Sequence, residues 1–233
     1  DDASVAGGST AIGSVTEDSG VVASSASGQV VVNDVDQGEA GTQAVTVPTE
    51  AVSGYGSYTV DTNGNWTYDI NNAHPGVDAL SVGLWLTDTF TVTSTDGRAS
   101  QLVTVTIVGT NDAPVAVGDE IVMNEGDVSG SVNVLINDTD VEGDTLTPGP
   151  STLPANGSIG LNLNGDFSYT PNVELAGQID ALGADDTLTD SFIYNISDGS
   201  GGTGTATVNV TIQGVNDDPI IAGVAGGAVT EGD

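Results

Sequence analysis

The feature that most constrains this chain of 233 residues is an internal repeat. The ending "VTIVGTNDAP" at 105–114 returns as "VTIQGVNDDP" at 210–219, and "NGNWTY" at 63–68 returns as "NGDFSY" at 164–169. The matches keep their order along the chain, at a spacing of about 100 residues. A fixed period of this kind indicates that one structural unit has been copied.

We therefore expect two complete modules flanked by parts of their neighbours. The chain begins at Asp1 without a methionine and ends on a third repeat start, "TEGD", which leads us to expect a piece of a longer array. The expected segments are the end of a preceding linker at 1–8, a first sandwich at 9–110, a linker at 111–116, a second sandwich at 117–215, and a further linker with the start of a third repeat at 216–233.

Hydrophobicity alternates within each copy with a period of two, as in half-buried strands, and no segment shows a helical period. Trp66, Tyr68 and Ile70 alternate with polar residues, and each copy carries an Asn-Gly pair between two such runs. Asn-Gly is the strongest short hairpin signal. About seven short strands in roughly 100 residues predict an all-β fold of tandem antiparallel β-sandwich modules, immunoglobulin-like or cadherin-like, in a linear array.

Charge limits the possible partners. The chain has 33 Asp and Glu residues against one basic residue, Arg98, for a formal net charge of -32. Nucleic acids and anionic membranes need Lys and Arg to replace their counterions, so both are excluded as partners, and cations are favoured. There is no cysteine and no lysine, which excludes disulfides and lysine-derived cross-links, so packing or metal ions must stabilise the fold.

The motifs carry a family resemblance. The first copy, with "GSYTVDTNGNWTYDI" and "LTDTFTVTSTDG", resembles a VCBS repeat. The second, with "NDTDVEGDTLT" and "DSFIYNISDGSGGTGTATVNVTI", is similar to the tandem cadherin-like repeats of giant RTX-type bacterial adhesins. This resemblance implies an extracellular, calcium-dependent array that projects a binding tip from the cell. The first copy departs from the commoner pattern at 71–86, where a small extra element is expected.

Strand connectivity predicts where the acidic residues gather. In a seven-strand sandwich, the loop after the first strand, the loop before the sixth strand and the outgoing linker share one pole, and they meet the entry pole of the next module. Calcium takes six to eight oxygen ligands, so this junction suits it better than magnesium or zinc. Asp and Asn are also common turn formers, which is the alternative for each residue taken singly. The predicted ligands at the central junction are Glu17, Asp88, Asn111, Asp112, Asp138, Asp140 and Asp198.

Two further half-sites follow by the same mapping. The exit half-site of the second module comprises Glu125, Asp190, Asn216, Asp217 and Asp218, and the entry half-site of the first comprises Asp34 and Asp36 with Asp2. The loop "DTDVEGD" at 138–144 has the opening spacing of a calcium loop, but Gly149 stands where an EF-hand needs a bidentate Glu. We therefore interpret this loop as the entry-pole ligand set, with room for a second ion.

The remaining functional candidates are few. His74, the only histidine, lacks a nucleophile motif, so no catalytic residue is predicted. Trp66 and Trp85 could form a sugar platform, but we expect both in the core. The predicted function is structural: calcium-rigidified extender modules of a surface adhesin, extracellular, monomeric and not inserted in a membrane. The alternative is a lectin-like or homophilic binding module that uses 71–86 as its contact.

Overall fold

The computed structural model describes residues 3–17, 24–35, 40–162, 164–218 and 226, and these form an almost entirely β structure. Contacts divide the chain into two compact units. The first is formed within Asp1–Val115, Thr139–Thr147 and Ile196–Gly204, and the second within Ala116–Asp138, Pro148–Asn195 and Thr205–Asp233. No helix of the described segments is long and apolar enough to cross a membrane.

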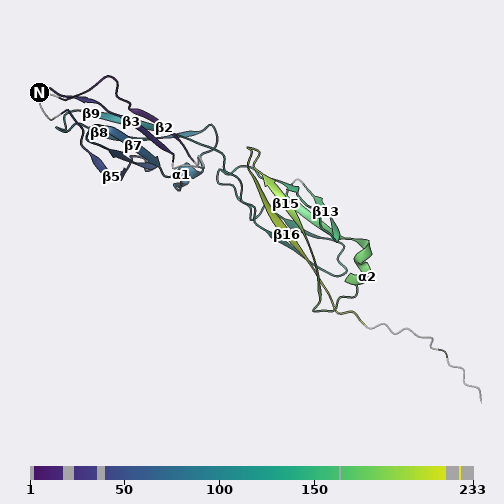
Figure 1. Cartoon of the computed structure of the whole chain (residues 1–233). Coiled ribbons are helices and arrows are strands. Elements are labelled where there is room, and N and C mark those ends of the chain that lie inside the picture. The colour runs from purple at the N-terminus through teal and green to yellow at the C-terminus, as the bar shows by residue number, and fades with distance from the viewer. Residues whose placement is uncertain (1–2, 18–23, 36–39, 163, 219–225, 227–233) are drawn as a thin grey trace, which may run out of the picture. The chain divides into compact units, whose positions relative to one another are not determined.

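The first module is a sandwich of two sheets (Figure 1). One sheet has the order β2-β9-β8, the other has the order β3-β7-β6-β5, and a short pair joins β1 to β4. The bounds are β1 (Ser4–Val5), β2 (Ile12–Thr16), β3 (Ser25–Gln29), β4 (Val32–Asn33), β5 (Val45–Glu50), β6 (Gly56–Val60), β7 (Asn65–Ile70), β8 (Trp85–Thr93) and β9 (Ser100–Val108). Ser4 and Val5 pair with β4, although the sequence placed them in a linker.

The second module also has two sheets, β10-β16-β15-β12 and β11-β14-β13, but its strand β12 lies in the sheet of the first and last strands, whereas β5 of the first module lies in the other sheet. Its strands are β10 (Asp119–Asn124), β11 (Gly130–Asn133), β12 (Thr147–Pro150), β13 (Gly157–Leu161), β14 (Asp166–Pro171), β15 (Thr187–Ser197) and β16 (Thr203–Gln213). In both modules the first main strand runs parallel to the last, β2 to β9 and β10 to β16, while the other pairs for which a register is known are antiparallel. The prediction of tandem all-β sandwich modules is confirmed.

Aromatic side chains join the two sheets of each module. In the first, the ring of Phe90 on β8 stacks on that of Tyr58 at 4.2 Å between centroids and meets that of Trp66 edge-on at 5.6 Å. In the second, Phe167 and Phe192 are 5.2 Å apart. These rings come from opposite sheets, so burying them holds each sandwich closed.

The predicted Asn-Gly hairpins are confirmed between β6 and β7 and between β13 and β14. In the first hairpin, Gly64 has a φ of 77°, and a Cβ there would collide with the carbonyl of Val30. The Asp61 carboxylate accepts hydrogen bonds from the N–H groups of Asn63 (2.9 Å) and Asn65 (2.8 Å). It also accepts from the Asn65 amide at 2.7 Å, and this bond, the largest influence, lowers the pKa of Asp61.

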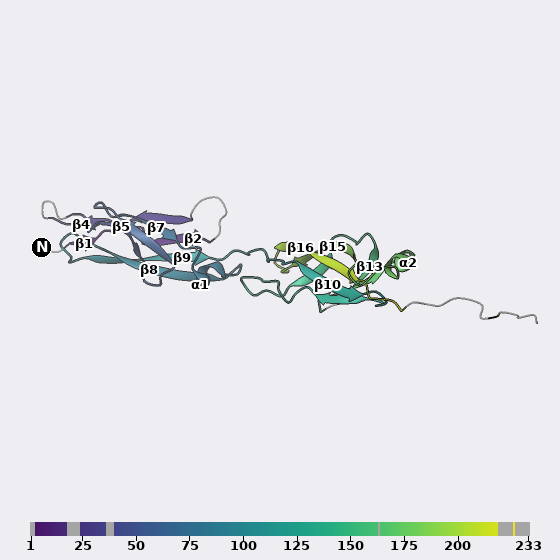
Figure 2. The same ribbon diagram turned by 90° about the horizontal axis from the view of Figure 1, so that it is seen from below.

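Short helices are present where the period-two analysis predicted none. The first module contains α1 (Pro75–Asp78), which confirms the extra element expected at 71–86. The second contains a 3-10 turn, η1 (Val173–Leu175), and α2 (Ala176–Ile179), so the expectation that helices find no support is wrong at both places. Figures 1 and 2 show α1 at the end of the first module opposite β1 and β4.

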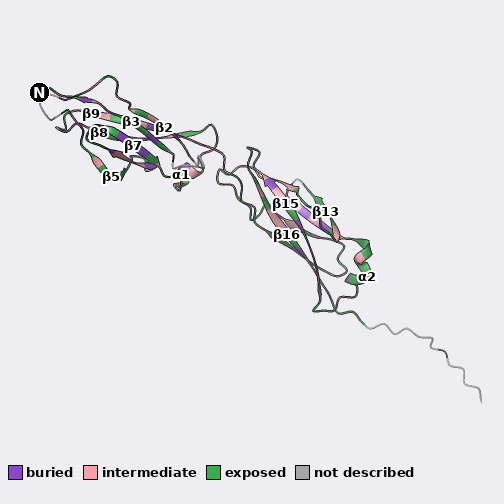
Figure 3. Cartoon of the chain, viewed as in Figure 1, coloured by how far each residue is buried: buried purple, intermediate pink, exposed green. Residues whose placement is uncertain are grey.

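Burial alternates along β8 and corrects the interpretation of Trp85 (Figure 3). Asp88, Phe90 and Val92 point inward and are buried, whereas Trp85, which differs from them in parity, is 67% exposed. Trp66 is buried as predicted, at 1% exposure. The prediction that Trp85 lies in the core is therefore wrong.

Candidate metal centre

Asp88 holds a turn of its own module. It is fully buried, and its Oδ1 accepts hydrogen bonds from the N–H groups of Ser53 and Thr89, both at 2.8 Å. Its Oδ2 accepts from the N–H of Tyr55 and the hydroxyl of Tyr68, both at 3.1 Å. Burial raises the pKa of Tyr68, and the negative charge of Asp88 raises it further. Four donors saturate the carboxylate, which makes Asp88 a structural anchor, and we remove it from the proposed ligand set.

Asp190 repeats this arrangement in the second module. Its two oxygens accept from the N–H groups of Ala155 (3.1 Å), Asn156 (2.7 Å) and Ser191 (2.9 Å) and from the hydroxyl of Tyr169 (3.0 Å). The repeated "LTD" motif thus encodes a turn anchor, and Asp190 also leaves the proposed ligand set.

Glu17 and Glu125 tie the first strand of each module to its outgoing linker. Oε1 of Glu17 accepts from the N–H of Thr110 at 2.7 Å, and Oε1 of Glu125 accepts from the N–H of Val215 at 2.7 Å. Glu17 has no exposed surface. Arg98, the one Lys or Arg of the sequence, lies at the opposite end of β9, beside Asp96 at 3.8 Å.

The linker after β9 is held by acidic side chains of two later loops, and all these segments belong to the first compact unit. The amide of Asn111 donates to Oδ2 of Asp198 at 2.8 Å and to the carbonyl of Asp112 at 2.8 Å. The N–H of Asp112 in turn donates to Oε1 of Glu142 at 2.8 Å. The structure therefore brings together Asn111, Asp112 and Asp198, as the sequence predicted.

Asp198 sits in the turn between β15 and β16 and is buried. Its Oδ1 accepts from the N–H groups of Ser200, Gly201 and Gly202 at 2.7–3.0 Å. The hydrogen bond from the Asn111 amide has the largest effect on the pKa of Asp198, and the three backbone bonds add to it. Together they hold this pKa below its ordinary value. Asp198 therefore carries a negative charge at the linker at neutral pH.

Asp138 lies in the second unit, 8% exposed. Its Oδ1 accepts from the N–H of Val117 at 2.8 Å and from the hydroxyl of Tyr194 at 3.0 Å. Asp119 shares this environment, and burial, reinforced by the charge of Asp138, raises the pKa of Asp119. Two carboxylates therefore face one tyrosine.

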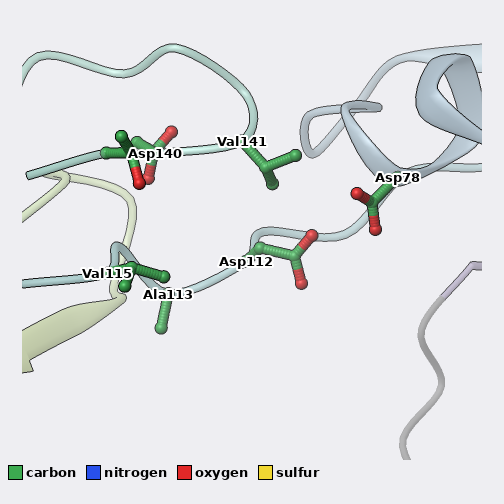
Figure 4. Close-up of a pocket in the computed structure, with 7 residues that line it drawn as sticks. Asp78, Asp112, Ala113, Val115, Asp140 and Val141 are labelled. Atoms are coloured by element: carbon green, nitrogen blue, oxygen red, sulfur yellow. The ribbon is translucent and has the colours of Figure 1, made fainter. Parts of the chain in front are cut away.

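Asp140 lines a pocket of about 420 Å³ in the first unit (Figure 4). Asp78 of α1, Asp112 and Val141 line the same pocket, and Figure 4 shows the carboxylates of Asp78 and Asp112 on either side of one space. Oδ1 of Asp140 accepts from the N–H of Asp144 at 2.9 Å.

Two acidic oxygens around this linker are buried and lack a hydrogen-bond partner among the described residues: Oδ2 of Asp140 and Oε2 of Glu142. A buried carboxylate oxygen without a donor is unfavourable unless a cation or water completes it. The donor set is made of hard oxygens, as calcium requires. However, no three Asp, Glu or His side chains within the described part converge as a ready metal site. The oxygen ligands and the two buried oxygens without a hydrogen-bond partner thus suit calcium, although no cluster of three carboxylates is formed among the described residues.

The outer half-sites are less well defined. The amide of Asn216 donates to the carbonyl of Asp217 at 3.3 Å, repeating the geometry of Asn111 with Asp112. Asp217 and Asp218 are exposed, and Asp34 is half-buried after β4. Asp36 and Asp2 lie outside the described residues.

Two acidic residues near these sites, Asp78 and Asp119, were absent from the prediction, and Glu142 was included only as part of the loop at 138–144. Glu142 stands in the acidic loop "DTDVEGD", which we interpret from the sequence as a ligand set without naming Glu142 singly. Asp78 belongs to a helix that the period-two analysis did not predict, and Asp119 is the first residue of a strand.

Comparison with known proteins decides the family. The bacterial cadherin-like domain profile matches residues 1–109 and again 111–214. This chain belongs to the bacterial cadherin-like domain family. Both cadherin-like domains match the same profile, including the one that resembles a VCBS repeat.

Two individual proteins extend the comparison. The chain is 32% identical over 185 residues to the calcium-binding lectin RapA2 of Rhizobium johnstonii, covering 70% of this chain and 75% of that protein. It also matches the EC1-2 structure of human protocadherin-24 with a TM-score of 0.51 at 12% identity, over 94% of this chain and all of that one. At this identity, the second likeness shows the cadherin-like fold alone.

Asp112→Ala is expected to weaken calcium binding at least tenfold, because it removes a carboxylate from the linker. Asp140→Asn should do the same from the other side of the pocket, while it keeps the Oδ1 that accepts from Asp144. Asp61→Ala, at the β6–β7 turn, should leave the affinity unchanged. Isothermal titration of the three variants measures this, and a normal isotherm for Asp140→Asn beside a lost one for Asp112→Ala would show that the two residues do not share an ion.

Proposed function

We propose that these cadherin-like domains are calcium-rigidified extender modules of a large secreted or surface bacterial adhesin, of the RTX type that the sequence resembles. In this role they project a distal binding region for cell adhesion or biofilm formation. The observation that carries the proposal is the acidic linker: Asn111 and Asp112 are bound by Asp198 and Glu142, side chains that follow them by 30 residues or more.

Calcium would be held by the carboxylate and amide oxygens of side chains around this linker. The proposed ligands are Glu17, Asn111, Asp112, Asp138, Asp140, Glu142 and Asp198. Bound there, the ion would supply the positive charge that the sequence lacks, with 33 acidic residues against one basic residue, and would join segments that otherwise repel one another. The name of the calcium-binding relative supports the same ion.

The proposal also covers organisation and location. We place the modules at 9–110 and 117–215, joined by a calcium-binding linker at 111–116, in an extracellular protein at the bacterial surface. Millimolar extracellular calcium would suit sites of modest affinity, on the order of 0.1 to 1 mM. The partners are calcium and neighbouring repeats, with no membrane insertion and no oligomer. No reaction is assigned, and His74 has a structural role, since its Nδ1 accepts from the N–H of Gly76 and caps α1.

Small-angle scattering tests the extender function. With calcium, the distribution of maximum dimensions of the two-module chain should narrow, because the ion fixes the linker. EDTA should broaden it, and magnesium at equal concentration should do distinctly less than calcium because it requires a stricter octahedron. An unchanged distribution in EDTA would overturn the proposal, and an equal response to both ions would indicate general screening of the -32 charge.

A second candidate function is saccharide binding. The relative RapA2 is named a lectin, and the segment 71–86 of this chain carries exposed apolar residues in the turn before β8 and at the first residue of that strand: Val82 is 65%, Leu84 55% and Trp85 67% exposed. Exposed aromatic residues of this kind are typical of binding surfaces. A glycan array separates this candidate from the purely structural one.

A further inference from the structure

The outward face of sheet β2-β9-β8 is made of alternate residues of three strands. The parallel register pairs Ile12 of β2 with Thr104 of β9, and the antiparallel register pairs Thr104 with Thr89 of β8. Residues of the opposite parity, such as Val105 and Phe90, are buried in the core. The outward face therefore runs from Trp85 to Thr93 on β8, from Ser100 to Val108 on β9 and from Ile12 to Thr16 on β2.

This face carries no charge, in a chain with a formal net charge of -32. Its 13 positions hold nine Ser or Thr residues and four apolar ones, and none is Asp, Glu, Lys or Arg. The corresponding sheet of the second module differs, because exposed Glu120 on β10 breaks its neutrality and Thr187 stands at the place of Trp85. The uncharged face is thus particular to the first module.

Trp85 lies at one end of the face, beside Val108, and is 67% exposed. Directly below it, Thr87 pairs with Thr106, and Thr89 pairs with Thr104. Opposite residues on neighbouring strands are about 5 Å apart, and successive pairs on one face are about 7 Å apart along the strand. An indole ring is therefore followed by regular rows of hydroxyl groups.

We propose that this face binds an uncharged polysaccharide, with one sugar ring stacked on Trp85 and the following rings hydrogen-bonded to the Thr and Ser rows. A pyranose has an apolar C–H face that suits an indole and hydroxyl groups that can donate to, and accept from, Thr hydroxyls. This proposal rests on the second candidate function, saccharide binding, and assigns it a location on the molecule. It does not depend on the extender function.

Charge excludes the other occupants. Without bound calcium, a nucleic acid or an acidic polymer would be repelled by the -32 chain, and a second copy would bring another -32 to the contact. A wholly apolar partner would leave nine hydroxyl side chains without water or donors. A neutral, hydroxyl-rich polymer avoids both penalties.

Tryptophan fluorescence tests the site, because Trp66 is buried and Trp85 supplies the accessible signal. The two-module chain is titrated with laminarin, xyloglucan and galactomannan, with alginate as the acidic arm, each in calcium and in EDTA. A neutral polysaccharide should shield Trp85 from acrylamide quenching. Trp85→Thr, which installs the residue found at this place in the second module, should weaken binding measured by calorimetry at least tenfold, with an unchanged melting temperature.

Val47→Thr is the matched control, since Val47 is 72% exposed on the other sheet and should bind like the wild type. Binding that survives Trp85→Thr, or calcium-dependent binding of alginate alone, would keep the saccharide-binding candidate and overturn this location. A dimer lost on Trp85→Thr in sedimentation would make a second copy the occupant and overturn the proposal. Failure of every polysaccharide would overturn both this site and the second candidate, while the scattering test of the extender function would stand unaffected.

Discussion

Asp88→Ala is expected to lower the free energy of unfolding of the first module by about 3 kcal/mol or more, because one buried donor and three partly buried donors lose their acceptor at once. The N–H groups of Ser53, Tyr55 and Thr89 and the hydroxyl of Tyr68 all point at this carboxylate. Urea unfolding followed by near-UV circular dichroism measures the effect, and the calcium isotherm per folded molecule should remain that of the wild type.

Two matched variants distinguish the loss of a hydrogen-bonded anchor from the simple loss of a negative charge. Asp190→Ala should destabilise the second module in the same way, whereas Asp69→Ala, which removes an exposed acid of β7, should change stability by no more than about 0.5 kcal/mol. A stable Asp88→Ala variant that has lost calcium binding would return Asp88 to the ligand set and contradict its role as a turn anchor.

Glu17→Gln is expected to change stability in opposite directions with and without calcium. In EDTA, the variant should be more stable than the wild type by about 1–3 kcal/mol, since a buried charge is removed while Oε1 still accepts from Thr110. In calcium, it should be the less stable of the two, because a ligand charge is lost. Thermal unfolding in both conditions measures the crossover.

Glu125→Gln provides the comparison, since Glu125 is only half-buried and its linker leads out of the second module. It should give a smaller gain in EDTA and leave calcium binding at the first linker intact. Equal destabilisation by Glu17→Gln in both conditions would indicate that Glu17 only anchors Thr110 and binds no ion.

The fold could be predicted from local signals. To predict which side chains point into the core, the alternation of odd and even positions along each strand had to be applied more strictly. Period-two runs and Asn-Gly turns correctly predicted the strands and hairpins, because both are properties of a few adjacent residues. Trp85 and Asp88 were assigned to the wrong environments, although the sequence contains the correction: Asp88 is in phase with buried Phe90, and Trp85 is not. Side chains alternate strictly along a strand, so phase should outweigh residue type.

The extra element at 71–86 was expected, but its helical conformation was missed for another reason. A four-residue helix is too short to show a periodic pattern, and its signals are a cap and a first-turn proline, here His74 and Pro75. The partners of the acidic linker depend on long-range contacts. Glu142 accepts a hydrogen bond from the N–H of Asp112, which lies 30 residues earlier in the sequence. Only the folded chain shows that Glu142 is the acceptor, rather than Asp140 or Asp144.

The parallel pairing of β2 with β9 has a mechanical consequence. After the short β1–β4 pair, the chain runs into β2 at its start and leaves the module at the end of β9, so tension on the two ends pulls these neighbouring strands in opposite directions along their length. Their hydrogen bonds, which run across the direction of the load, must then break together rather than one at a time as in an unzipping hairpin. The β10–β16 pair has the same geometry, so each module resists a stretching force through a ladder loaded in shear.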